Sequence, residues 1–141
     1  MRSVRRAHTK PEIVVRKLLH RVGLRFRLQQ LGLPGTPDIV LPKHRTVVFV
    51  HGCFWHRHPG CKKATTPKTR AEFWREKFER NVHRDQANEE ALIRGGWHVV
   101  IVWECETKHT EALLHRLRNT FTSRRAAKLN SPSSIKLDTA E

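Results

Sequence analysis

The apolar and polar positions at the start of the chain predict an amphipathic helix. Residues 9–12, Thr-Lys-Pro-Glu, have the Thr-x-x-Glu pattern of a capping box, with proline in the first turn where its missing N–H costs nothing. The apolar residues that follow recur at helical spacing: Val15, Leu18, Leu19 and Val22. Gly23 is suited to the position after a helix, so the helix is expected to end there.

Three short strands are predicted next, at residues 25–28, 38–41 and 46–50. Residues 33–37, Leu-Pro-Gly-Thr-Pro, form a turn before the second strand, and residues 42–45 form the turn before the third. The third run, Thr-Val-Val-Phe-Val, is apolar on both faces. That pattern indicates a central, fully buried strand.

The second half of the chain begins with a loop rich in Cys, His, Lys and Pro at residues 51–69. A long helix is predicted for residues 70–94, because a Gly-Gly pair ends its pattern. A buried strand at 97–103 and a final helix at 109–119 follow. The rest of the chain is rich in Ser, Lys and Arg, and a disordered basic tail is expected over residues 122–141.

This order predicts one α/β domain, residues 1–121, with a mixed central sheet flanked by helices. No stretch approaches the roughly 18 to 20 apolar residues of a membrane span, and no apolar segment follows the basic N-terminus as in a signal peptide. The three cysteines are an odd, sparse set, which argues against a disulfide framework and for free thiols or metal ligands. We therefore expect a cytoplasmic protein without a membrane partner.

The charge of the chain narrows the function further. A net charge of +15 indicates a polyanionic partner, because each Lys or Arg placed against a phosphate releases condensed counterions. A ribosomal or histone-like binder is one interpretation of charge alone. However, residues 1–71 contain sixteen Lys and Arg and only two acids, Glu12 and Asp38. Cations that hold a nucleic-acid backbone, with a few carboxylates that hold Mg²⁺, favour a nuclease.

The loop after the third strand carries a candidate metal site. The candidate ligands are Cys53, His58, Cys61 and Cys105. The first three form a C-x4-H-x2-C cluster, and cysteine with histidine at such short spacing suits tetrahedral Zn²⁺. The alternative is unligated thiols with solvated histidines, since the fold must close the gap to the last cysteine. Spacing alone does not choose among His51, His56 and His58, although the last lies closest to Cys61.

Aromatic and polar residues of the loop and the long helix suggest DNA contacts. Phe54 and Trp55 are either a small local core or a wedge that enters between base pairs. Trp74, Lys77 and Asn81 share one helical face at i, i+3 and i+7. Such a face could read base edges in a groove, and the alternative is a core tryptophan beside two solvated polar residues.

The two isolated acids also have two interpretations each. Asp38 begins a strand after Pro-Gly-Thr-Pro and could be a turn residue. Because the adjacent strand delivers His51 and His56, a Mg²⁺ site is favoured. Glu12 could be no more than the capping partner of its helix, worth about 1 kcal/mol.

Six motifs, in chain order, resemble those of the Vsr (very short patch repair) mismatch endonucleases. They are Thr-Lys-Pro-Glu at 9–12, Leu-Pro-Gly-Thr-Pro-Asp at 33–38, Phe-Val-His-Gly-Cys-Phe-Trp-His at 49–56, Glu-Phe-Trp-Arg-Glu-Lys at 72–77, Gly-Trp-His-Val at 96–99 and Val-Trp-Glu-Cys at 102–105. The resemblance implies a fold related to type II restriction endonucleases. It also implies that Asp38 binds catalytic Mg²⁺, with Glu12 nearby through a water shell. His56 would activate the attacking water, and His51 would lie near the metal-bound phosphate.

The same resemblance implies roles for the loop and the long helix. The implied structural zinc ligands are Cys53, His58, Cys61 and Cys105. The implied intercalating wedge is Phe54, Trp55 and Trp74, with Lys77 and Asn81 as base-reading residues. The implied substrate is double-stranded DNA with a T:G mismatch left by deamination of 5-methylcytosine, nicked 5′ to the thymine. A monomer at the bacterial nucleoid, with mismatch-repair proteins as further partners, is the expected setting.

Two other functions fit part of the pattern. One is a restriction-like endonuclease that cuts both strands of unmodified duplex. The absence of a Glu-x-Lys motif after the Asp38 strand argues against it. The other is a catalytically inactive, zinc-stabilised DNA-binding module, and the isolated Asp38 argues against that.

Overall fold

A four-stranded sheet and three helices form the part of the chain, residues 9–28 and 32–129, that the computed structural model describes. In chain order the elements are α1 (Lys10–Arg21), β1 (Arg27–Leu28), β2 (Ile39–Leu41), a 3-10 turn (Pro42–His44), β3 (Thr46–His51), α2 (Ala71–Arg94), β4 (His98–Trp103), a second 3-10 turn (Glu104–Lys108) and α3 (Thr110–Leu129). The predicted order of helices and strands and the mixed α/β class are confirmed. No helix of the described residues is long and apolar enough to cross a membrane.

The sheet has the order β1-β2-β3-β4 and is mixed. β1, β2 and β3 pair antiparallel, whereas β3 and β4 pair parallel, in a register that runs from Thr46 opposite His98 to His51 opposite Trp103. The carboxyl ends of two parallel neighbours lie at the same edge of a sheet. The loop that follows β3 and the 3-10 turn that follows β4 therefore meet at one edge.

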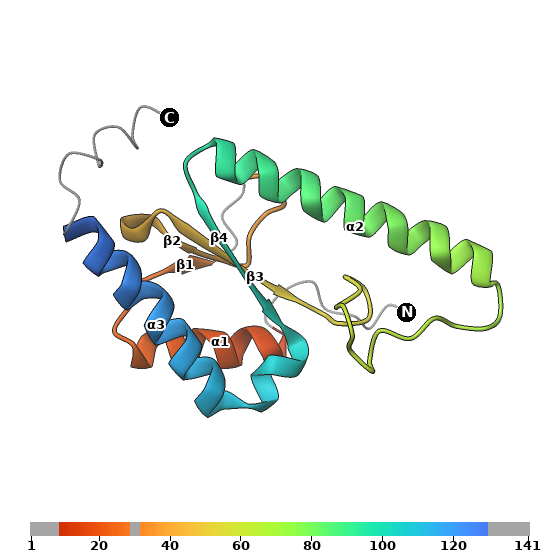
Figure 1. Ribbon diagram of the computed structural model, residues 1–141, viewed down its shortest axis with the longest axis horizontal. Helices are drawn as coiled ribbons and strands as arrows, with labels where there is room; N and C mark the ends of the chain where they lie inside the picture. The colour runs from red at the N-terminus through yellow and green to blue at the C-terminus, as the bar shows by residue number, and fades with distance from the viewer. Residues whose placement is uncertain (1–8, 29–31, 130–141) are drawn as a thin grey trace.

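Helices cover both faces of the sheet. α1 and α3 lie together on one side of it and α2 lies on the other (Figure 1). Ile39 and Val48 pack in the core beneath α1 and α3, and Val40 and Val47 pack with Leu92 of α2. Successive residues of a strand point to opposite faces. β3 is thus buried on both faces, as its apolar run predicts.

The predicted helix signals are present. Thr9 caps α1 by accepting a hydrogen bond from the backbone N–H of Glu12 at 3.4 Å. Gly23 follows α1 with φ 87°, and Gly96 follows α2 with φ 89°. L-residues with a side chain rarely adopt this left-handed region, which is why glycine ends both helices.

Two elements differ from the prediction. β4 is an edge strand in the described sheet and only its Val102 is fully buried, so the prediction of a buried strand at residues 97–103 is wrong. The apolar composition of β4 did not reveal that, among the described residues, no strand pairs with its outer edge. At that edge Arg116 donates a hydrogen bond to the carbonyl of Ile101 at 2.9 Å. α3 continues to Leu129 and not to residue 119, because Phe121 extends its buried face. Residues 130–141 lie outside the described residues, so a disordered tail there stays a prediction.

Candidate active site and metal centre

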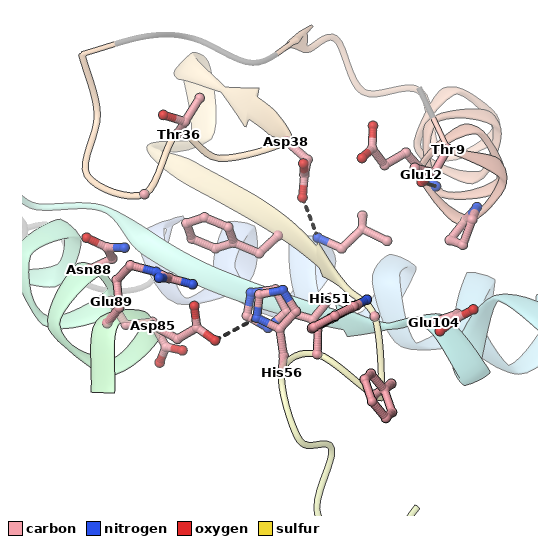
Figure 2. A pocket seen from close by; sticks show the side chains of 18 residues that line it. Thr9, Glu12, Thr36, Asp38, His51, His56, Asp85, Asn88, Glu89 and Glu104 are labelled. Carbon is pink, nitrogen blue, oxygen red and sulfur yellow. Dashed lines mark hydrogen bonds and ion pairs between the residues drawn. The ribbon is translucent and has the colours of Figure 1, made fainter. Parts of the chain in front are cut away.

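The four residues predicted to be catalytic line one cavity of about 820 Å³ (Figure 2). Glu12 comes from α1, Asp38 immediately precedes β2, His51 ends β3 and His56 lies in the following loop. The cavity opens at the carboxyl end of β3, and residues of α2 form its opposite wall. Side chains that are far apart in sequence are therefore brought together.

Asp38 and Glu12 form a pair of close carboxyl groups. The Oδ2 atom of Asp38 accepts a hydrogen bond from the backbone N–H of Val50 at 2.7 Å (Figure 2). Burial and, to a smaller extent, the adjacent Glu12 raise the pKa of Asp38 to about 7, against the lowering effect of this bond. Glu12 is buried and lies 3.5 Å from Arg16. Two carboxyl groups that share a site favour a divalent cation with oxygen ligands, so this donor set fits Mg²⁺.

His51 and His56 form a stacked pair beside these carboxyl groups. Their ring centroids are 3.8 Å apart and the ring planes differ by 5°. Burial and, to a smaller extent, the neighbouring His56 lower the pKa of His51 to about 4. His51 is therefore a neutral imidazole near neutral pH.

Asp85 of α2 completes the histidine group, and sequence reasoning missed it. Its Oδ2 atom lies 2.6 Å from Nδ1 of His56 (Figure 2). A carboxylate only accepts hydrogen bonds, so Nδ1 donates and Nε2 keeps a lone pair that can take a proton. The sequence held one signal for this residue. Asp85 lies seven residues, about two helical turns, after Phe78 and seven before Leu92, the two buried residues of α2, so its carboxylate lies on the inward face of the helix.

The second group of ligand atoms lies at the same edge of the sheet. The side chains of Cys53, His58, Cys61 and Cys105 place one ligand atom each within 4.8 Å of all the others. Nδ1 of His58 is 3.6 Å from Sγ of Cys53 and 3.5 Å from Sγ of Cys105. The imidazole also stacks on Trp103, with 4.3 Å between ring centroids. The structure therefore groups His58 with the cysteines, and His51 and His56 with Asp85.

This Cys/His group could hold a metal ion. All three cysteines are free, and burial raises the pKa of the Cys53 thiol to about 12. A buried thiol of this kind ionises when a cation binds it. Three thiols and one imidazole around a common centre are a donor set that suits tetrahedral Zn²⁺.

Aromatic side chains gather between the loop and the first turns of α2. The members of this aromatic cluster are Phe54, Trp55, Phe73, Trp74 and Phe78. Phe54 lies at its centre, with ring centroids 5.0 Å from Trp55 and 5.2 Å from Phe78. Phe78 is buried, whereas Trp55 is 37 % exposed and, with Phe54, lines the cavity. The cluster thus has a buried base at Phe78 and an exposed aromatic rim at Trp55, beside Phe54. Features of both a local core and a wedge are present.

Asn81 supports this rim from α2. Its Nδ2 atom donates to the carbonyl of Trp55 at 3.3 Å, and its Oδ1 atom accepts from Arg84 at 2.9 Å. Lys77 lies one turn earlier on the same helix and is half-buried. The predicted polar face of α2 is thus adjacent to the aromatic cluster, with Asn81 already bound to the loop.

The chain is similar to known proteins over most of its length. The profile of the family described as DNA mismatch endonuclease Vsr matches residues 1–63. Type II nicking enzyme V.XorIIP of Xanthomonas oryzae is 54 % identical over 119 residues, which cover 84 % of this chain and 87 % of the relative. Type II nicking enzyme V.NmeAIP of Neisseria meningitidis is 45 % identical over 117 residues, which cover 83 % of each chain.

A third relative carries the family name. DNA mismatch endonuclease Vsr of Escherichia coli is 45 % identical over 113 residues, which cover 80 % of this chain and 72 % of the relative. The shared region extends well beyond the 63 residues that the family profile matches and spans most of the chain. The chain belongs to the Vsr family of DNA mismatch endonucleases, and it is a DNA endonuclease.

Proposed function

We propose that this endonuclease nicks one strand of duplex DNA on the 5′ side of the thymine of a T:G mismatch. The observation that carries the proposal is the convergence of Asp38, Glu12 and the two histidines on one cavity with an exposed aromatic rim. The substrate would be DNA in which 5-methylcytosine has been deaminated. The proposal includes monomeric action at the bacterial nucleoid, with mismatch-repair proteins as further partners.

The proposed cofactors are catalytic Mg²⁺ at Asp38 and structural Zn²⁺ at the Cys/His group. Mg²⁺ bound near the paired carboxyl groups would stabilise the negative charge that develops on the scissile phosphate. Asp38 and Glu12 would orient it, with the Val50 N–H fixing one carboxylate oxygen. A mixed sheet with helices on both faces and acids beside its central strands also supports a restriction-endonuclease-like fold.

His56 is the proposed general base. With Nδ1 donating to Asp85, Nε2 can accept a proton from the attacking water. The neutral His51 stacks against it and can donate a hydrogen bond to a phosphate oxygen. In this proposal His56 accepts the proton and His51 binds the substrate.

The decisive experiment uses one duplex sequence with T:G, T:A, C:G or C:A at a single position. We expect Mg²⁺-dependent cleavage of the T:G duplex, in the thymine strand only, mapped on a denaturing gel. A restriction-like enzyme would instead linearise supercoiled plasmid without a mismatch. An inactive DNA-binding module would bind the duplexes and cleave none of them.

Replacement of Asp85 by Asn should lower the single-turnover nicking rate by about a hundredfold, the contribution typical of general acid–base catalysis. The neutral amide can donate to Nδ1 and so favour the wrong imidazole tautomer. DNA affinity should be unchanged. Glu89→Gln is the matched control, because Glu89 lines the same cavity from α2 and the change also removes a carboxylate. Equal rate losses in both variants would mean that Asp85 contributes only its negative charge and does not orient His56.

The exposed aromatic rim supports the proposed choice of a mismatch. A side chain that enters between base pairs must unstack them, and a mispaired step costs less to unstack than a sound one. The cations of the chain attract any duplex through its phosphates, and that attraction does not depend on pairing. Insertion of Phe54, Trp55 and Trp74 is therefore the proposed source of selectivity.

Phe54→Ala and Trp74→Ala should each reduce the preference for T:G over T:A duplex by about tenfold, since a stacking contact is worth about 1 to 3 kcal/mol and 1.4 kcal/mol is tenfold. Affinity for the T:A duplex should change little. Lys62→Ala, an exposed cation of the same loop, should instead weaken both duplexes alike. Titrations of both duplexes and thermal melts separate these cases. A large drop in melting temperature with unchanged selectivity would make the aromatic cluster a local core.

A further inference from the structure

The loop between β3 and α2 depends on a single arginine side chain for much of its internal bonding. Arg57 lies between the loop residues His56 and His58, with φ 55° in the left-handed region that few residues other than glycine adopt. Its Nη1 atom donates to the carbonyls of Phe54 at 3.1 Å and Thr65 at 2.9 Å. The side chain therefore turns back onto its own loop.

The other end of the guanidinium group binds the returning half of the loop. Nη2 donates to the carbonyl of Ala64 at 3.0 Å and to Oγ1 of Thr66 at 3.1 Å. The guanidinium carbon lies 3.8 Å from the ring centroid of Phe78 and 5.7 Å from that of Phe54. Arg57 thus joins the aromatic cluster, the returning loop and α2 through one planar group.

This bonding leaves little capacity for DNA. A guanidinium group has five N–H donors, four of them on the two terminal nitrogens. All four are accounted for by Phe54, Thr65, Ala64 and Thr66. Only Nε–H remains, so Arg57 is poorly suited to bind a phosphate in the usual two-pronged way. Its contacts indicate an internal role, unlike that expected of the other basic residues.

We infer that Arg57 is a positioning residue for mismatch selection, because it holds Phe54 in the geometry for insertion before DNA arrives. The inference rests on the proposed function, in which the aromatic rim senses how easily a base step opens. A loop that is ordered during folding does not lose that conformational freedom again on binding. Selectivity then depends on Arg57 although it touches neither the mismatch nor the scissile phosphate.

The test compares Arg57→Met, Arg57→Lys and a matched control, Arg75→Met. Lysine keeps the charge but cannot span four acceptors in one plane or stack as a flat group. Arg75 lines the same cavity of about 520 Å³ as Arg57, and its ion-pair partner is the exposed Glu72. Both Arg57 variants should lose about tenfold in the ratio of T:G to T:A affinity, the loss expected for truncating the wedge itself. Arg75→Met should keep the ratio.

Two further readouts separate positioning from general support. A 2-aminopurine beside the mismatch reports unstacking, and its fluorescence gain on binding should fall in both Arg57 variants. Combining Arg57→Lys with Phe54→Ala should cost no selectivity beyond Phe54→Ala alone, because Arg57 acts through Phe54. Bound metal and melting temperature are measured for every variant.

Several outcomes would overturn the inference. They are wild-type selectivity in Arg57→Lys, equal weakening of both duplexes, additive losses in the double variant, or loss of the fold in both Arg57 variants. A wild-type protein that does not prefer T:G over T:A would defeat the proposed function first, before any variant is compared. If the wild-type protein prefers T:G but the Arg57 variants behave as listed above, only the Arg57 inference fails. The two failures are therefore distinguishable.

Discussion

Asp38→Asn is expected to reduce the single-turnover nicking rate by about a thousandfold or more, since a metal-bound phosphate is stabilised by several kcal/mol and each 1.36 kcal/mol is tenfold. Asparagine has nearly the same shape, and its Oδ1 atom can still accept the hydrogen bond from Val50. The lost property is the negative charge that is proposed to face Mg²⁺. Affinity for T:G duplex should stay within a few fold, because the carboxylate is proposed to bind the metal and not the DNA.

The measurement is a quench series at saturating enzyme in Mg²⁺, with binding followed separately in the absence of divalent cations. Glu111→Gln, an exposed carboxylate in the first turn of α3, controls for the change in net charge and should nick at the wild-type rate. Near wild-type nicking by Asp38→Asn would mean that the active site lies elsewhere. If Asp38→Asn needs a higher Mg²⁺ concentration for half-maximal nicking, that result would agree with the proposed role of Asp38 in binding the metal.

Cys105→Ser is expected to remove the structural metal and to lower the melting temperature by about 10 °C or more, because a structural zinc site contributes several kcal/mol to folding. Cys105 follows β4, whereas its three fellow ligands lie in the loop after β3. Loss of this proposed ligand should free the loop that carries the aromatic rim and His56. Nicking should therefore fall together with stability.

Metal analysis of the purified protein is the direct check, with about one zinc per chain expected in the wild type and almost none in the variant. His109→Ala, an exposed histidine four residues further on, should keep its metal and its melting temperature. Active wild-type protein with a zinc content near zero would show that the Cys/His group is not a structural zinc site.

The sequence predicted best those elements whose residues repeat with a clear period or carry a specific end signal. The Thr9 cap, the glycines after α1 and α2, and the doubly apolar run of β3 all appear where expected. These signals are local, since a cap or a strand pattern is set by residues within a few positions of one another. Boundaries that depend on tertiary packing, such as the end of α3, were less accurate.

The candidate site was accessible to sequence reasoning only in part. Asp38 and Glu12 stood out because they are isolated in a basic half of the chain, and the motif resemblance supplied the roles of the histidines. Asp85 carried only the signal of its spacing from Phe78 and Leu92, and Arg57 carried none, because each meets its partner only in the folded chain. A side chain whose task is to bind its own loop cannot be recognised before the loop's path is known.

The parallel pairing of β3 with β4 also determines when, during synthesis, this enzyme can become active. A ribosome releases Asp38, His51 and His56 early, but α2 must cross over before β4 can join the sheet. The His56–Asp85 pair cannot form until α2 has been made, and the four-residue Cys/His group cannot form until Cys105 has been made. Stalled chains of increasing length are expected to retain metal only once Cys105 has emerged. An incomplete chain would therefore present basic residues that attract DNA before the groups proposed to cut it are assembled.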